Sequence, residues 1–143
     1  MLARAPSRTE VRNSLVGYPK ESHLHLGKPK GKPVSDSLPL VPGTLEMLVL
    51  KTLTLQPMHG WGIGERIQQL SRDAFHVNQG TLYPVLERLQ QRGWVTAAWQ
   101  ASDNNRRSKY YSLTRAGQRR LAAERSDWER SAAAINLILQ TEA

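Results

Sequence analysis

Apolar residues between positions 38 and 143 recur with helical spacing, and glycine, proline or short polar runs separate the segments. The first segment is apolar on nearly every side, which predicts a central helix. Thr44 is a suitable N-cap for this helix, which should end near Gln56 because Pro57 disfavours helical geometry in the preceding residue. Phe75 and Val77 alternate in a short stretch that we expect to be extended. Between these segments lies a second, shorter helix, whose apolar face is made of Ile63, Ile67 and Leu70.

A third helix is predicted to end at Gly93, a natural C-terminal stop. The residues alone leave its start open. Pro84 belongs in a first helical turn, which favours Thr81 as the N-cap, whereas a start at Asn78 leaves Pro84 inside the helix and requires a local distortion. The apolar face of this helix is formed by Leu82, Val85, Leu86 and Leu89.

A β-hairpin is predicted next. Trp94–Gln100 reads as one strand and Lys109–Leu113 as the return strand, because apolar residues alternate in both. Ser102–Asn105 has the composition of a turn. Arg106 and Arg107 follow the turn, so the hairpin should have a basic tip.

The last predicted helix is long. Thr114 can cap it, and it runs to about Gln140. Apolar residues repeat along it at heptad spacing, which is typical of a helix that pairs with a second copy. The alternative is that this seam packs on the first helix of its own domain. The seam residues, and so the candidate dimer interface, are Leu121, Trp128, Ala132, Ile135 and Leu139.

This order of elements predicts a winged helix-turn-helix, a mainly α fold with a small β-hairpin wing, followed by a long dimerisation helix. In such folds the third helix enters the DNA major groove with its N-terminus leading. Side chains there read base edges or bond phosphates, and wing arginines can enter a minor groove. The candidate DNA-binding residues are Asn78, Gln79, Gly80, Thr81, Tyr83, Arg88, Arg106, Arg107 and Lys109.

Other interpretations of these residues stay open. Tyr83 can equally pack against the wing, and Arg106 and Arg107 can belong to an ordinary solvated loop. A winged helix can also serve as a protein-interaction module without specific DNA binding. An enzyme is disfavoured, because the four histidines lack carboxylate partners at motif spacing and the chain has no phosphate-cradling glycine loop.

The chain carries 20 basic and 12 acidic side chains, a formal charge of +8. Half of that charge lies in residues 1–37, which hold seven basic and three acidic groups and no sustained apolar period. We therefore expect residues 1–37 to be a disordered basic leader, either without function or as an arm that touches DNA. Residues 38–113 would form the DNA-binding domain and residues 114–143 the dimerisation helix.

Cysteine is absent, which excludes a disulfide framework and a thiolate metal cluster. The longest run of large apolar residues is Met47–Leu50, far short of a membrane span, and no signal-peptide pattern is present. These features predict a cytoplasmic protein with no membrane association, no cofactor and no metal.

Four motifs carry a family resemblance. They are His59-Gly60-Trp61-Gly62-Ile63, Gly80-Thr81-Leu82-Tyr83-Pro84 with Leu86, Arg92-Gly93, and Arg107–Thr114 with Gly117. In this order and spacing, residues 39–140 resemble the PadR family of bacterial transcriptional regulators. Trp61 departs from the family pattern, where tyrosine is commoner, and the 37-residue leader is not part of it.

The resemblance implies a cytoplasmic homodimer, in most members a repressor. The two-fold symmetry of such a dimer implies a palindromic or near-palindromic operator, with half-sites about one helical turn apart. The resemblance also implies that the third helix begins before Gly80, and on this ground we expect the earlier start. Some members release DNA when they bind small aromatic compounds. By that analogy Trp128, with Trp99, is the candidate effector site, while plain packing in the seam is the alternative.

Overall fold

The computed structural model describes residues 37–142. The leader expected over residues 1–37 therefore lies outside the described residues, apart from Ser37. The chain divides into two compact units, of which the second begins at Ser37, and only this second unit is described below.

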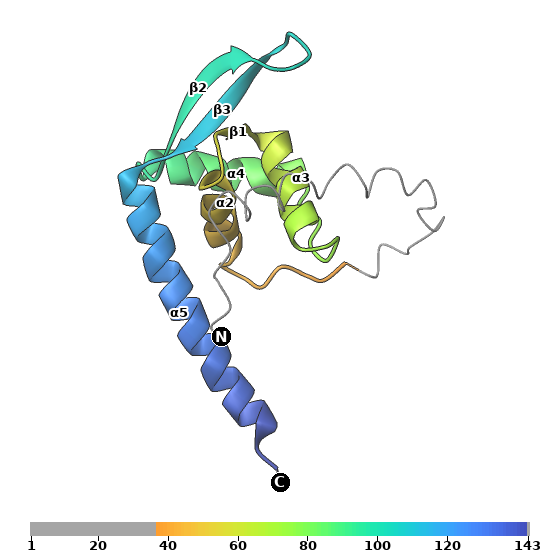
Figure 1. Cartoon of the computed structure of the whole chain (residues 1–143), viewed down its shortest axis with the longest axis vertical. Coiled ribbons are helices and arrows are strands. Elements are labelled where there is room, and N and C mark those ends of the chain that lie inside the picture. Colours follow the sequence, from red (N-terminus) through yellow and green to blue (C-terminus); the bar gives the residue numbers. More distant parts are fainter. Residues whose placement is uncertain (1–36, 143) are drawn as a thin grey trace, which may run out of the picture. The chain divides into compact units, whose positions relative to one another are not determined.

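Four helices and one small sheet make up the described residues (Figure 1). The strands pair antiparallel in the order β1-β3-β2, so β3 lies in the middle. β2 and β3 form the hairpin, with Val95 opposite Leu113 at its base and Ala101 opposite Arg107 near its tip. In chain order the elements are α2 (Leu45–Leu53), β1 (Met58–His59), α3 (Gly60–Leu70), α4 (Gln79–Gln91), β2 (Val95–Ala101), β3 (Arg107–Leu113) and α5 (Arg115–Gln140).

One hydrophobic core holds α2, α3, α4 and the base of the hairpin together. The apolar faces predicted from the sequence supply most of it, and α5 adds the partly buried Leu121. The largest fully buried apolar side chains are Val49, Leu50, Ile63, Leu82, Leu86, Leu89 and Val95. The mainly α winged helix-turn-helix with a long last helix is thus confirmed. None of the described helices is long and apolar enough to span a membrane.

The first helix is shorter than predicted and is capped differently. It ends at Leu53, where the backbone N–H of Thr54 donates to the carbonyl of Lys51 and the N–H of Leu55 donates to that of Thr52. Thr44 stands at the N-cap position, but its hydroxyl donates to the carbonyl of Val41 at 2.7 Å and makes no cap to the helix. The hydroxyl bonds within the turn before the helix, as threonine side chains commonly do, and is therefore not used as a cap.

The short extended element lies elsewhere than predicted. Phe75 and Val77 form no strand; they pack on the core from a loop, where the N–H of Phe75 donates to the hydroxyl of Ser71. The strand that joins the hairpin is instead Met58–His59, which pairs with Tyr111 and Tyr110 of β3. Two residues are too few to show an alternation in the sequence.

The remaining boundaries agree closely with the prediction. Helix α4 begins after Asn78, so the earlier start is correct and the Thr81 cap is wrong; Pro84 lies inside the helix. Helix α5 is capped by Thr114, whose hydroxyl accepts from the N–H of Gly117 at 3.0 Å. Strand β3 already begins at Arg107, so of the two tip arginines only Arg106 belongs to the turn.

Candidate nucleic-acid interface

The first turn of α4 is held by Asn78. Its side-chain Oδ1 accepts from the backbone N–H of Thr81 at 2.8 Å and from the Thr81 hydroxyl at 3.0 Å. This is an N-cap, and it leaves the amide NH₂ of Asn78 as the donor that the side chain can offer outward. Asn78, Gly80 and Thr81 are all exposed.

Gln79 and Tyr83 are partly turned toward α3. The Oε1 atom of Gln79 is buried without a hydrogen-bond partner, and its Nε2 lies beside Gly64 of α3. The ring edge and hydroxyl of Tyr83 lie against Gly60, the first residue of α3, so closely that a Cβ there would come within 2.8 Å. Tyr83 nevertheless stays 47 % exposed, so it packs and presents a surface at the same time.

Arg88 lies on the side of α4 away from the hairpin. Its Nε is 3.4 Å from Oε1 of Glu46 in α2, and Arg92 approaches the same carboxylate at 3.9 Å. The Glu46 side chain is mostly buried, so these pairs tie the recognition helix to α2. The sequence places Arg88 among the DNA-binding residues, and this ion pair gives it a structural role as well.

The hairpin turns its cationic residues toward α4. Residues with odd numbers share one face, so Trp99, Arg107, Lys109 and Tyr111 lie together. The guanidinium of Arg107 is 6.0 Å from the centre of the Trp99 ring, and the ammonium of Lys109 is 5.8 Å from that of Tyr111. The rings of Trp99 and Tyr111 therefore position Arg107 and Lys109 on the hairpin face that is turned toward α4.

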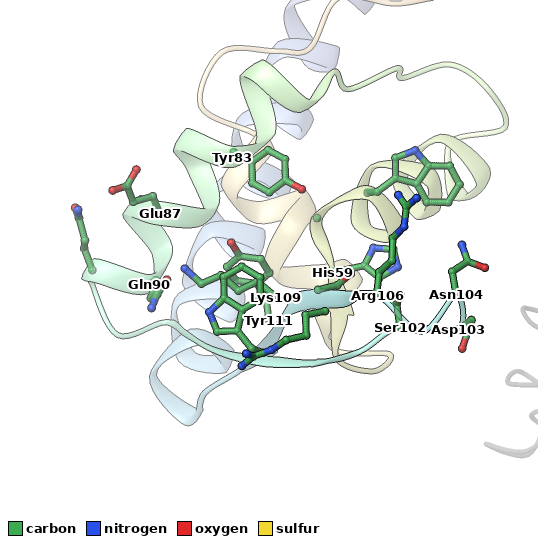
Figure 2. Close-up of a pocket in the computed structure, with 16 residues that line it drawn as sticks. His59, Tyr83, Glu87, Gln90, Ser102, Asp103, Asn104, Arg106, Lys109 and Tyr111 are labelled. Atoms are coloured by element: carbon green, nitrogen blue, oxygen red, sulfur yellow. The ribbon is translucent and has the colours of Figure 1, made fainter.

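A cleft of about 1080 Å³ separates α4 from this face of the wing. Figure 2 shows Tyr83, Glu87 and Gln90 along the helix side and Lys109 and Tyr111 on the strand side. Arg106, Ser102, Asp103 and Asn104 line it at the hairpin end. The cleft is open and carries cations on one wall, as a groove for a phosphate backbone requires.

Tyr111 forms the floor of this cleft and is 4 % exposed. Burial raises the pKa of its hydroxyl above the ordinary value of 10.0, and Tyr83 and Glu87 nearby raise it further. The hydroxyl is therefore protonated at neutral pH, and Tyr111 itself adds no negative charge beside Lys109.

Sequence reasoning missed three polar residues that α4 contributes to the cleft. Glu87, Gln90 and Gln91 all line it from α4. Glu87 lies one helical turn after Tyr83 on the same face, and this i, i+4 spacing was a signal that could have found it. Trp61, which is 60 % exposed, also lines the cleft.

The seam of α5 is largely exposed in the single chain. Trp128 is 41 % exposed, Ile135 54 % and Leu139 75 %, whereas Leu121 near the start of the helix packs on the core. Ala132 is partly buried. Helix α5 packs on α2, and in Figure 1 its blue C-terminal end runs on beyond the rest of the unit.

Trp99 and Trp128 do not share a site within one chain. Trp99 lines the wing cleft, and Trp128 is not among the residues of that cleft. Any site that contains both would have to be completed by a second copy.

Three helices, a cationic hairpin beside the third of them and an open cleft between the two define a winged helix-turn-helix of the DNA-binding class. Comparison with known proteins then places the chain within that class. The model of the transcriptional regulator PadR-like family matches residues 49–123, and the chain belongs to this family. Its members are non-enzymatic transcription regulators that bind DNA.

Solved structures share the architecture. A PadR-like transcriptional regulator from Bacillus cereus is 25 % identical, with a TM-score of 0.61 over 70 % of this chain and 95 % of that one. A PadR family regulator from Eggerthella lenta is 29 % identical, with a TM-score of 0.60 over 70 % and 85 % of the two chains. An uncharacterized protein from Lysinibacillus sphaericus is 23 % identical over 71 % of this chain and 93 % of its own length.

Proposed function

We propose that the protein is a homodimeric repressor of the bacterial cytoplasm that binds a palindromic DNA operator. The observation that carries this proposal is the pairing of an exposed, capped helix start with a cationic wing face across one open cleft. The start of α4 enters the major groove, the adjacent phosphate backbone runs in the cleft, and the wing reaches the neighbouring minor groove.

Base reading falls to the exposed start of α4. Asn78 offers its amide NH₂, Thr81 its methyl group and Tyr83 its exposed ring and hydroxyl, while Gly80 lets the backbone approach the groove. Gln79 reads a base only when its amide turns away from α3, where its oxygen is now buried without a partner. That unpaired oxygen favours such a turn, because an unsatisfied buried acceptor is costly.

Phosphate binding falls to the cations. Arg106 is exposed at the wing tip, where it lines the cleft together with Arg107 and Lys109. Arg88 keeps half of its side chain exposed while it pairs with Glu46, so we assign it a flanking phosphate contact secondary to that ion pair.

Residues 114–143, which contain α5, mediate pairing, and residues 38–113 bind DNA. The seam of Leu121, Trp128, Ala132, Ile135 and Leu139 meets the same seam of a second copy. Trp128, Ile135 and Leu139 support this, since all three are more than 40 % exposed in the single chain. Repression needs nothing beyond occupancy of a promoter by such a dimer.

A small planar aromatic effector, if it acts, is expected at Trp128, where two copies of the indole would face each other across the seam. Trp99 would line the site only from the partner copy. Titration of planar aromatic compounds, followed by tryptophan fluorescence and by release of DNA, tests this assignment. A response that survives in Trp128→Ala removes Trp128 from the site.

Selection from a random-sequence duplex library at physiological salt tests the function itself. The expected product is a palindrome whose half-site centres lie about one helical turn apart, bound at least about 10³-fold more tightly than random duplex. Equal affinity for selected and random DNA contradicts specific regulation and favours a protein-interaction module.

A further inference from the structure

We propose that the junction between α4, the base of the hairpin and α5 sets the separation of half-sites that the dimer accepts. The junction consists of Gly93, Trp94, Thr114, Gly117 and Arg120. This inference rests on the proposed dimeric operator binding, but concerns spacing and not base sequence.

Helix α4 ends rigidly at the junction. Gly93 takes a positive φ of 73°. Its N–H donates to the carbonyl of Gln90 at 3.0 Å, and the N–H of Trp94 donates to that of Leu89 at 3.0 Å. These two bonds form a Schellman motif, which closes the helix and fixes the direction of the next residue.

Thr114 joins this end to the beginning of α5. Its hydroxyl donates to the carbonyl of Gly93 at 2.7 Å and accepts from the N–H of Gly117 at 3.0 Å. Its backbone N–H donates to the carbonyl of Trp94 at 3.1 Å. One threonine therefore bonds both the end of the recognition helix and the cap of the pairing helix.

The two backbones touch without space between them. A Cβ on Gly117 would collide with the carbonyl oxygen of Trp94 and lie 2.7 Å from Cδ1 of Leu113. The Trp94 ring has two guanidinium neighbours, Arg92 at 5.1 Å and Arg120 at 4.7 Å. Arg120 is fixed in turn by Glu124 at 2.8 Å.

Little else holds α5 in its direction. Beyond Glu124 the residues up to Gln140 are exposed, apart from the partly buried Ala132. The packing of α5 on α2 and the junction itself are therefore what relate the pairing seam to α4.

The angle between α4 and α5 determines how far apart the two α4 starts of a dimer lie, and so the separation of the half-sites. The 13 residues of α4 span about 20 Å, with the junction at one end and the DNA-reading start at the other. A tilt of about 10° at the junction moves the reading end by about 3.4 Å, which is one base pair of B-DNA. A junction that limits the tilt of α4 to less than about 10° lets the dimer bind half-sites at one separation only.

The test uses the full chain and the palindrome that it selects from a random duplex library. Its spacer is lengthened and shortened in single base pairs, and affinities are measured for each duplex and for a single half-site. The variants are Arg120→Ala and Trp94→Leu. The control is Arg125→Ala, which removes the same charge from the same helix and the same kind of pair, with Glu129 at 2.9 Å, but does not touch Trp94.

Wild type and Arg125→Ala are expected to bind one spacer about tenfold more tightly than its neighbours. Arg120→Ala and Trp94→Leu should narrow this ratio to about threefold or move the optimum by one base pair, with single half-site affinity matching that of the control. An Arg120→Ala variant whose affinities for the different spacers match those of the wild type overturns the proposal. This result decides the test even when Trp94→Leu fails to fold. Failure of the wild type to select any sequence instead contradicts the proposed function.

Discussion

At the scale of single residues, Asn78 has two roles that substitution can separate. Its Oδ1 caps α4, and its NH₂ is the group left for a base. Because aspartate also accepts at an N-cap and adds a charge that the helix dipole favours, Asn78→Asp keeps the cap and removes the donor.

For Asn78→Asp we expect a free energy of unfolding equal to or above that of the wild type and a loss of about 1–3 kcal/mol in specific DNA binding. Asn78→Ala is the control, since it should lose about 1 kcal/mol of stability together with binding. Urea unfolding and titration of the selected duplex measure the two quantities. Wild-type DNA affinity in Asn78→Asp would show that this amide does not read the operator.

Glu87 is the unexpected member of the interface, a carboxylate on the cleft side of the recognition helix. A carboxylate repels phosphates but can accept from the N4 amino group of cytosine, so a base contact by Glu87 would increase specificity at a cost in affinity. We expect Glu87→Gln to bind random duplex several-fold more tightly and to discriminate less against substitution of a C·G pair in the selected site. If Glu87→Gln increased the affinity for selected and random DNA equally, Glu87 would act only as a surface charge that repels phosphates.

At the scale of elements, periodicity in the sequence predicted the four helices and the hairpin. Helices α2, α3 and α4 and the base of the hairpin bury their apolar residues in one core, and α5 repeats its apolar residues at heptad spacing. The shared carboxylate of Glu46 could not be foreseen, because Arg88 lies 42 residues away along the chain. The two-residue strand Met58–His59 was likewise invisible, since its partners lie on β3. Side-chain direction at the site, such as that of Gln79 toward Gly64, depends on tertiary packing that periodicity does not record.

The wing is the element whose charge should govern salt dependence. Arg106→Ala/Arg107→Ala removes up to two phosphate contacts, so the slope of log affinity against log salt should become shallower by about 1–2. Arg125→Ala/Arg130→Ala removes the same charge from exposed positions on α5 and should leave that slope unchanged. Equal slopes for both double variants would exclude the wing from the interface.

At the scale of the whole molecule, the net charge of +8 explains little by itself, because half of it lies in residues 1–37. Residues 38–143 carry 13 basic and 9 acidic groups, a net charge of only +4. So modest a charge supports weak binding to one half-site, and two half-sites held by one dimer multiply their affinities through effective concentration. Operator binding should therefore depend on pairing.

Ile135 tests this dependence, because it lies on the seam and is 54 % exposed in the single chain. Ile135→Asp places two carboxylates across the two-fold axis and removes apolar contact, so we expect monomers at micromolar concentration in analytical ultracentrifugation. Affinity for the palindrome should fall to that for a single half-site. Helix content and core stability should be retained, because the side chain contributes nothing to the core of its own chain.

Leu137→Asp is the matched control. Leu137 is 68 % exposed and lies about 200° around the helix from Ile135, on the face opposite to the seam. The same charge there should leave a dimer with full affinity for the palindrome. If Leu137→Asp were monomeric and Ile135→Asp remained a dimer, the interface would lie on the other face of α5. A wild-type chain that stays monomeric and still binds the palindrome cooperatively would require pairing through another surface.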